Sequence, residues 1–441
     1  MPAGTPRSRW LFRLSPGASR AIVAACVFAY GVFVSSLVAV ESRPVAAAAP
    51  GWYEISAGEV PASDYFDAGA IARGKRYRAA RLGFQGGFLA LEIAFWGLLL
   101  ATGAARRLAA QASRVTGERF WLTALVFFVA LFVLRQVWSY PLALVSRAHR
   151  VDAGLSTQSA ASWHLDWLLA SGGSAMLGAL GFALAYVVSR RLPRLWWLVV
   201  GTGAAALIVI GSYVWPVVVA PIFNRFEELA DGELRTRLVE MAERYGIDVD
   251  AIVVMDASRR SPHTNAYFAG VGATRRIVLY DTLLAEHTDD EVVAVLAHEI
   301  GHWRGGHVPR GIAWGAFGTF GLLFLVDRAL AFWSRRGPSG VDAKHQLAGA
   351  PVFLLVVTLG NVFTLPIQNA ISRQMEREAD DFELAATGDP RLLISGMQKM
   401  ALRNLADVEP HPLVEWVFSS HPSTMARIRR ALAEERRRGI E

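Results

Sequence analysis

Two histidines and a glutamate stand at a spacing suited to metal chemistry. His298, Glu299 and His302 form a His-Glu-x-x-His pattern. On a helix, His298 and His302 share one face, so both imidazoles can bind one Zn²⁺ while Glu299 lies near enough to take a proton from a metal-bound water. The pattern alone is only moderately specific, because most histidines are ordinary surface or core residues. It predicts metal-assisted hydrolysis with Glu299 as the general base.

A third protein ligand is expected elsewhere, because a catalytic zinc site uses three and leaves one position for water. Glu376 and Asp380 stand four residues apart and share a face if their segment is helical. Glu376 is the expected ligand, and Asp380 the carboxylate that accepts the N–H of a ligating histidine. Without the upstream motif, the same residues would describe a solvated acidic face beside Arg373 and Arg377.

The remaining histidines near these segments are weaker candidates. His421 lies in Ser-His-Pro-Ser, 420–423, from where its ring could approach the oxyanion of a tetrahedral intermediate. His263, His307 and His411 are more typical of surface loops.

The chain that must position these residues is apolar enough for a membrane protein. It is 53% hydrophobic and only 19% charged, and Cys26 is its single cysteine, which excludes an internal disulfide. Its net charge of +7 resides in short basic connections, which are typical of membrane topology and not of a nucleic-acid surface. Seven stretches approach the length of a membrane-spanning helix. They are 21–41, 84–104, 120–146, 168–189, 195–222, 310–333 and 350–371.

Several of these stretches contain polar residues that lipid does not tolerate. Glu92, Arg135, Asn361 and Asn369 are expected to face a bundle interior or a water-filled cavity. Arg135 could instead extend to the membrane surface or pair with a neighbouring carboxylate.

Two regions, 223–309 and 372–441, break the apolar pattern and are expected to form the soluble part, with 1–222 and 310–371 forming the membrane part. Helical spacing over 234–245 predicts one amphipathic helix with Asp231 as its N-cap. Short β-type runs at 251–256 and 276–281, with a third at 265–268, predict a small sheet. Asp289 and Asp290 are the expected capping residues of the helix that carries the His-Glu-x-x-His pattern.

Four blocks of sequence together resemble the CAAX prenyl proteases, which are integral-membrane zinc metallopeptidases of the gluzincin type. The blocks are Thr-Asn-Ala-Tyr-Phe at 264–268 with 276–284, the metal motif at 295–303 with Gly306 and His307, Ser372 to Asp380, and 420–423 with Arg427. Their order and spacing are far more specific than the metal motif alone.

The resemblance implies a mainly α-helical fold, a barrel-like bundle of seven tilted transmembrane helices that encloses a chamber. A zinc metalloprotease domain with a small β-sheet would cap it. One Zn²⁺ per chain would be bound by His298, His302 and Glu376. A peptide or protein substrate, with or without an attached lipid, would lie against Asn265, Ala266, Tyr267 and Phe268. His421 would act in catalysis, and Arg427 would bind substrate or order the His421 loop. Membrane lipids are expected partners, and nucleic acid is not.

The chain departs from the family pattern in two places. Ser146 to Arg150 is basic where the family is acidic, which leaves recognition of a prenylated substrate open. The end of the chain has no lysine-rich retention signal, which leaves an endoplasmic reticulum address unsupported. Together with the Ala/Arg-rich composition, this favours a bacterial plasma membrane.

Membrane orientation and overall function each have alternatives. Basic residues in the short connections divide 14 against 8, which favours a cytoplasmic N-terminus and an external zinc domain. The resemblance implies a cytoplasmic zinc domain, which is the expectation adopted here. A quality-control protease of the HtpX type, a transporter and an inactive scaffold are the competing functions. The predicted span number argues against the first, and the lack of inverted repeats against the second.

Overall fold

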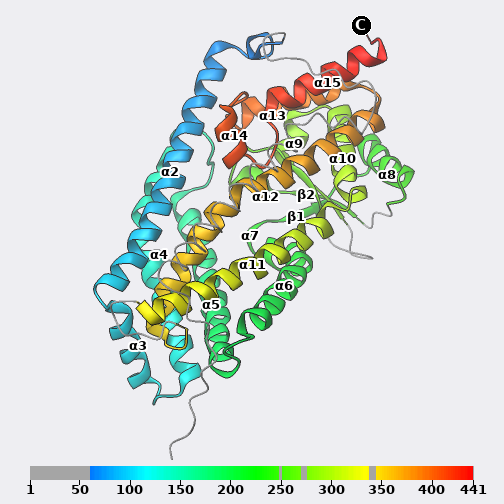
Figure 1. Cartoon of the computed structure of the whole chain (residues 1–441). Helices are drawn as coiled ribbons and strands as arrows, with labels where there is room; N and C mark the ends of the chain where they lie inside the picture. Colours follow the sequence, from blue (N-terminus) through cyan, green and yellow to red (C-terminus); the bar gives the residue numbers. More distant parts are fainter. Residues whose placement is uncertain (1–59, 248–250, 270–275, 337–343, 441) are drawn as a thin grey trace, which may run out of the picture.

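The computed structural model describes residues 60–247, 251–269, 276–336 and 344–440 of the 441-residue chain. Long helices lie side by side in a bundle, and a compact part with a small sheet sits at one end of it (Figure 1). The fold is mainly α-helical.

Five described helices are long and apolar enough to cross a membrane. They are α2 (Ala68–Ala101), α4 (Phe120–Asp152), α5 (Ala160–Arg191), α11 (His307–Arg336) and α12 (Ala350–Thr387). A sixth candidate is a pair bent by 50°, formed by α6 (Trp196–Val214), the π-turn η2 (Trp215–Val219) and α7 (Ala220–Phe223). The bend accompanies Pro216, which has no N–H to continue the helix. The predicted span at 21–41 lies outside the described residues.

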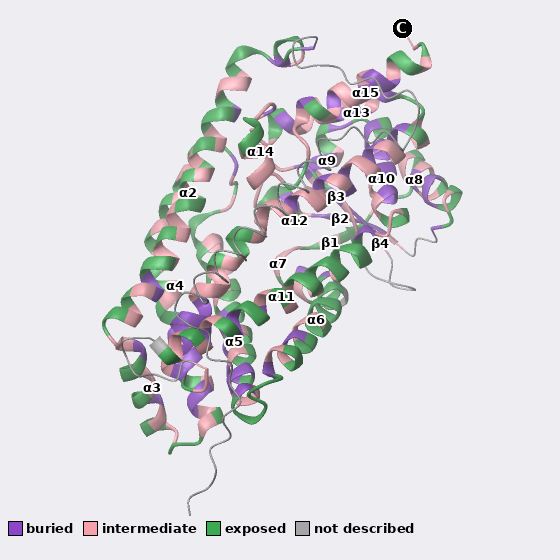
Figure 2. Ribbon diagram, viewed as in Figure 1, coloured by how far each residue is buried: buried purple, intermediate pink, exposed green. Residues whose placement is uncertain are grey.

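The helices of the bundle pack tightly at the end that lies away from the sheet. There α3 (Ala104–Val115) and the turn η5 (Leu347–Gly349) close over a core that includes Phe127, Phe128, Tyr186 and Phe353. Figure 2 shows buried residues concentrated near this end and again around the sheet.

Three of the four polar residues singled out in the spans have protein partners, whereas Asn361 is exposed. Arg135 of α4 donates from Nε to Glu92 Oε2 of α2 at 2.6 Å, and Trp96 Nε1 donates to Glu92 Oε1 at 2.7 Å. Pairing with a carboxylate is therefore the alternative that the structure supports for Arg135. Asn369 is buried and donates to the carbonyl of Val417 at 2.6 Å, so it joins α12 to the later helix that contains Val417.

The sheet has four strands in the order β1-β2-β4-β3, with β3 at one edge. The strands are β1 (Phe226–Glu228), β2 (Ala251–Met255), β3 (Ala266–Ala269) and β4 (Arg276–Tyr280). β2 and β4 are parallel, and the two outer strands run antiparallel to their neighbours. The three predicted strands are confirmed. β1 was not predicted, because Phe-Glu-Glu has no alternating apolar pattern.

Short helices surround the sheet. They are α8 (Glu233–Arg244), α9 (Asp281–Glu286), α10 (Asp289–Arg304), α13 (Pro390–Arg403), α14 (Pro412–Phe418) and α15 (Thr424–Arg438), with turns η1 (Ala62–Asp64) and η3 (Ala257–Arg259).

The predicted N-caps of α8 and α10 are wrong. Gly232 is the N-cap of α8, whereas Asp231 pairs with Arg235 one turn further on. Thr288 caps α10 in a capping box with Glu291, so Asp289 and Asp290 occupy its first turn.

Candidate metal centre

Helix α10 carries His298 and His302 against α12. Its opposite face is buried in the core beside the sheet, through residues that include Val292, Leu296 and Ile300. Gly301 permits the close approach of the two helices, because a Cβ there would lie 2.9 Å from Ala379 Cα. Because Glu376 lies one turn before Ala379 on α12, this contact brings Glu376 close to the two histidines.

The structure brings His298, His302 and Glu376 together. The Nε2 atoms of the histidines are 3.1 Å apart, and each lies 3.4 Å from an oxygen of Glu376. Ligands bound to tetrahedral zinc at about 2.0–2.1 Å are separated by about 3.3–3.4 Å. The three side chains therefore fit one zinc ion. Ligand atoms of Glu299 and the two histidines lie within 4.8 Å of one another.

His298 is supported by buried carboxylates of α12. Its Nδ1 lies 3.1 Å from Asp380 Oδ1 and 3.5 Å from Glu383 Oε2. Asp380 is fully buried and accepts from Arg427 of α15, at 2.5 Å from Nη2 and 3.0 Å from Nε. Glu383 was not singled out in the sequence, although it stands seven residues, or two turns, after Glu376.

His302 is supported from its other side by His307, at the start of α11. The two Nδ1 atoms are 2.8 Å apart, and His307 Nε2 lies 3.0 Å from Glu378 Oε2. Arg310 Nη1 donates to the same oxygen at 2.5 Å. The prediction that His307 is a surface residue is wrong: it is buried.

The electrostatics of the site favour a metal-binding His302. Burial and the charge of His298 lower the pKa of His302 to about 4, which keeps its ring neutral at pH 7, as a metal ligand must be. Removal from water raises the pKa of Glu299 to about 7. Burial opposes the charged form of His298, but its hydrogen bonds to Asp380, Glu376 and Glu383 hold the pKa well above its usual value.

His421 reaches the centre from the loop before α15. Its Nε2 lies 3.3 Å from Glu376 Oε1, Ser420 Oγ is 2.9 Å from its Nδ1, and the side chain is 60% exposed. Arg373 of α12 fixes this region, because its Nη1 donates to the carbonyls of Glu415 and Ser419, at 3.0 and 2.7 Å.

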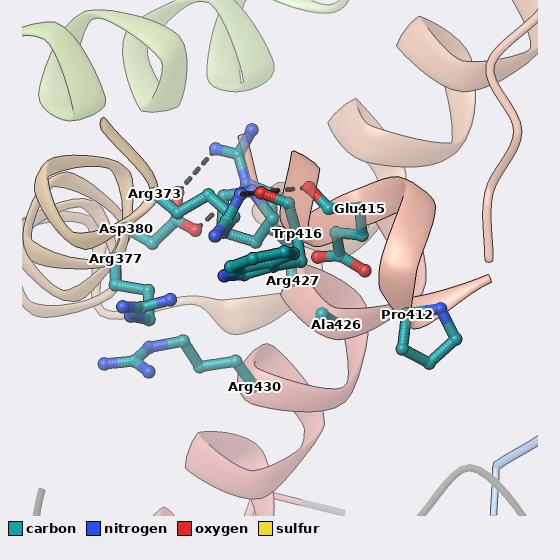
Figure 3. Close-up of a pocket in the computed structure, with 10 residues that line it drawn as sticks. Arg373, Arg377, Asp380, Pro412, Glu415, Trp416, Ala426, Arg427 and Arg430 are labelled. Atoms are coloured by element: carbon teal, nitrogen blue, oxygen red, sulfur yellow. Dashed lines mark hydrogen bonds and ion pairs between the residues drawn. The ribbon is translucent and has the colours of Figure 1, made fainter. Parts of the chain in front are cut away.

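A cleft of about 360 Å³ adjoins the Asp380–Arg427 pair (Figure 3). Arg377 and Arg430 lie on one side of it and Trp416 on the other. It is lined by side chains of α12, α14 and α15 and the loop between the last two.

The expected substrate strand coincides with the sheet edge. Asn265 is exposed just before β3, and Ala266 is buried. Tyr267 lies edge-on to Tyr280, and the ring centroid of Phe268 lies 6.5 Å from that of Trp303 on α10. His263 is half-buried against Asn404, and His411 is exposed at the N-cap of α14.

Two family models match consecutive parts of the chain. The model for CAAX prenyl protease N-terminal, five membrane helices, matches residues 56–225, and the model for peptidase family M48 matches residues 228–435. Together the two models match most of the chain, and they confirm the predicted resemblance to the CAAX prenyl proteases and its class, a membrane metallopeptidase.

Individual relatives agree with this assignment. The chain is 28% identical to the uncharacterized metalloprotease YhfN of Bacillus subtilis over 77% of this chain and 80% of that protein. It is 32% identical to CAAX prenyl protease 1 of Saccharomyces cerevisiae over 50% of this chain and 52% of that one, so it spans about half the length of this relative. The crystal structure of S. mikatae Ste24p has the same fold, with a TM-score of 0.75 at 23% identity, over 91% of this chain and 97% of that one.

Proposed function

We propose that this protein is an integral-membrane zinc endopeptidase. The observation that carries the proposal is the triangle of His298 Nε2, His302 Nε2 and the Glu376 carboxylate, whose sides of 3.1 to 3.4 Å fit tetrahedral zinc. These three residues would hold one zinc ion per chain. A zinc ion there supplies Lewis-acid polarisation of a carbonyl and a more acidic water.

Glu299 acts as the general base. It takes a proton from the attacking water and passes it to the nitrogen of the leaving amine, so the C–N bond breaks without a covalent enzyme intermediate. Asp380 accepts from His298 Nδ1 and fixes that ring. His421 donates to the oxyanion.

The substrate lies as an added strand along the open edge of β3. Asn265, Tyr267 and Phe268 offer backbone and side-chain contacts to an extended peptide, and Ala266 packs inward. Arg427 was expected among the substrate-binding residues. We assign it a supporting role, because its guanidinium is engaged by Asp380.

The substrate class is a peptide or protein, with or without a lipid, that enters a chamber within seven transmembrane helices. Residues 223–309 and 372–441 form the zinc-protease part, although α12 runs without a break through the boundary at 371. The protein lies in a bacterial plasma membrane with this part in the cytoplasm. A reporter enzyme fused to the C-terminus tests the orientation. If the reporter is active only when it is exported, the zinc-protease part lies outside the cell and the proposed orientation is wrong.

The first experiment compares wild type and Glu299→Gln in detergent. Zinc content and cleavage of a quenched farnesylated C-a-a-X peptide and its unprenylated twin are measured. We expect about one zinc per chain in both proteins and cleavage by wild type alone. A Glu299→Gln variant that still cleaves would remove Glu299 from the role of base. Zinc without cleavage of either peptide would overturn the substrate class, and a wild-type protein without zinc would overturn the function.

A further inference from the structure

A relay of side chains behind His302 has no role in the function proposed above. It consists of His307, Glu378 and Arg310, and it joins α10 to the first turn of α11 and to α12. We propose that His307, held by Glu378, is a positioning residue that fixes the ring orientation and the tautomer of His302. This inference rests on the proposed zinc site.

The hydrogen bonds of the relay determine where its protons lie. Glu378 accepts from Arg310 Nη1 at 2.5 Å and from Gln374 Nε2 at 3.2 Å, so its carboxylate is surrounded by donors. An ionised carboxylate only accepts, and His307 Nε2 at 3.0 Å must therefore carry a proton. In the neutral form of His307 the other nitrogen, Nδ1, is then the acceptor.

The acceptor at His307 Nδ1 fixes the tautomer of His302. The two Nδ1 atoms are 2.8 Å apart, so one proton lies between them, and it must come from His302. The lone pair of His302 is then on Nε2, the atom that lies 3.4 Å from Glu376 and 3.1 Å from the Nε2 of His298. The relay thus presents the nitrogen that a metal needs, just as a single carboxylate does for other ligating histidines.

The local sequence explains how His307 reaches this position. α10 ends at Arg304, and Gly306 has φ of +60°, which turns the chain directly into α11. The His307 ring then folds back over Gly305, where a Cβ would lie 2.3 Å from His307 Nε2. The two glycines therefore allow a residue only five positions after His302 to pack behind it.

The test measures metal affinity and not only turnover. His307→Ala, His307→Asn and Glu378→Gln are purified in detergent, stripped of metal, and titrated with zinc against a chromophoric chelator. His164→Ala, which removes an exposed histidine of α5, is the matched control. The visible spectrum of each cobalt-substituted protein reports ligand geometry independently.

We expect His307→Ala to weaken zinc affinity by about 10- to 100-fold, the usual effect of losing the partner of a ligating histidine. His307→Asn should fall between it and wild type, because its amide oxygen can accept from His302 Nδ1. Glu378→Gln should weaken affinity less than His307→Ala. The cobalt spectrum should change in His307→Ala and remain unchanged in His164→Ala.

Wild-type affinity and an unchanged cobalt spectrum in His307→Ala would overturn the relay, even if the metal-free variant unfolds at a lower temperature, because that result describes a structural residue. If His307→Ala does not fold, wild-type affinity in both His307→Asn and Glu378→Gln overturns it. If the wild-type protein binds no zinc, both the proposed function and the relay are overturned. If wild type binds zinc and the variants bind it with equal affinity, only the relay is overturned.

Discussion

The two histidines of the metal motif are supported in different ways. His298 faces the fully buried Asp380 and its ion pair with Arg427, and its own side chain is 11% exposed. His302 is 25% exposed and is supported by His307, whose partner Glu378 is itself 35% exposed. The first support belongs to the core that joins α12 to α15. The second lies at the junction of α10 with a membrane helix, where we expect a change to affect the metal site at a smaller cost to the fold.

The largest predicted effect is on the buried side. Asp380→Ala leaves Arg427 buried without its main partner. Arg427 cannot escape by losing its proton, because a guanidinium stays protonated in proteins. Breaking a buried ion pair costs about 3–5 kcal/mol, so the free energy of unfolding should fall by about that amount. Chemical unfolding of the metal-free protein in detergent measures it.

Asp381→Ala is the matched control for this substitution. Asp381 follows directly on α12 and pairs with Arg430, but its side chain is 36% exposed. Exposed pairs contribute about 0–1 kcal/mol. If Asp380→Ala and Asp381→Ala lowered the free energy of unfolding equally, the burial of the Asp380–Arg427 pair would not explain its contribution.

An intermediate effect is expected at the junction. In Gly305→Ala the new methyl group occupies the place of the His307 ring, while the backbone of Gly305, with φ of −68°, accepts alanine without strain. Overpacking of this kind costs about 1–3 kcal/mol, and we expect weaker zinc affinity along with it. Chelator competition and thermal unfolding measure the two effects separately.

Gly311→Ala provides the comparison within α11. No atom of the described residues lies within 4 Å of a Cβ added there, so the substitution should stabilise the helix by about 0.5–1 kcal/mol and leave zinc affinity unchanged. If zinc affinity in Gly305→Ala matched that in Gly311→Ala, the position of the His307 ring would not matter to the metal.

The smallest effect is expected at the outer end of the relay. Arg310→Ala removes a half-exposed partner of Glu378, and the unfolding free energy should change by no more than about 1 kcal/mol. Zinc affinity should decrease less than in His307→Ala, because Glu378 still accepts from Gln374 and His307. If Arg310→Ala lowered zinc affinity more than His307→Ala, Arg310 and not His307 would be the main determinant of zinc binding at His302.

The sequence predicted the parts of the molecule that rest on regular spacing. Residues four apart on a helix must share a face. The sequence therefore predicted that His298 and His302 share one helix face, and that Glu376 and Asp380 share another. Apolar length predicted the five described spans, and β-type runs predicted three of the four strands. Four ordered blocks predicted the family, which the comparisons confirm.

The remaining features depend on tertiary contacts that spacing does not encode. His307 reads as a loop histidine until Gly305 and Gly306 fold it against His302. The resemblance implied that Arg427 binds substrate or orders the His421 loop. No sequence pattern links it to Asp380, which lies 47 residues earlier and on another helix. The capping residue of α10 was misjudged because three consecutive residues, Thr288 to Asp290, can all cap a helix.

Helix α12 is both a candidate span and the helix that carries Glu376. From Ala350 to Glu376 the helix rises about 39 Å, whereas the hydrocarbon core is about 30 Å thick. A helix that enters the bilayer at Ala350 and crosses it along the membrane normal therefore holds Glu376 one or two turns past the opposite face. Under the proposed function, the bond to be cut in a membrane-attached substrate must reach that height. The distance along the substrate from its attachment point to the cleavage site would then be a criterion of selection.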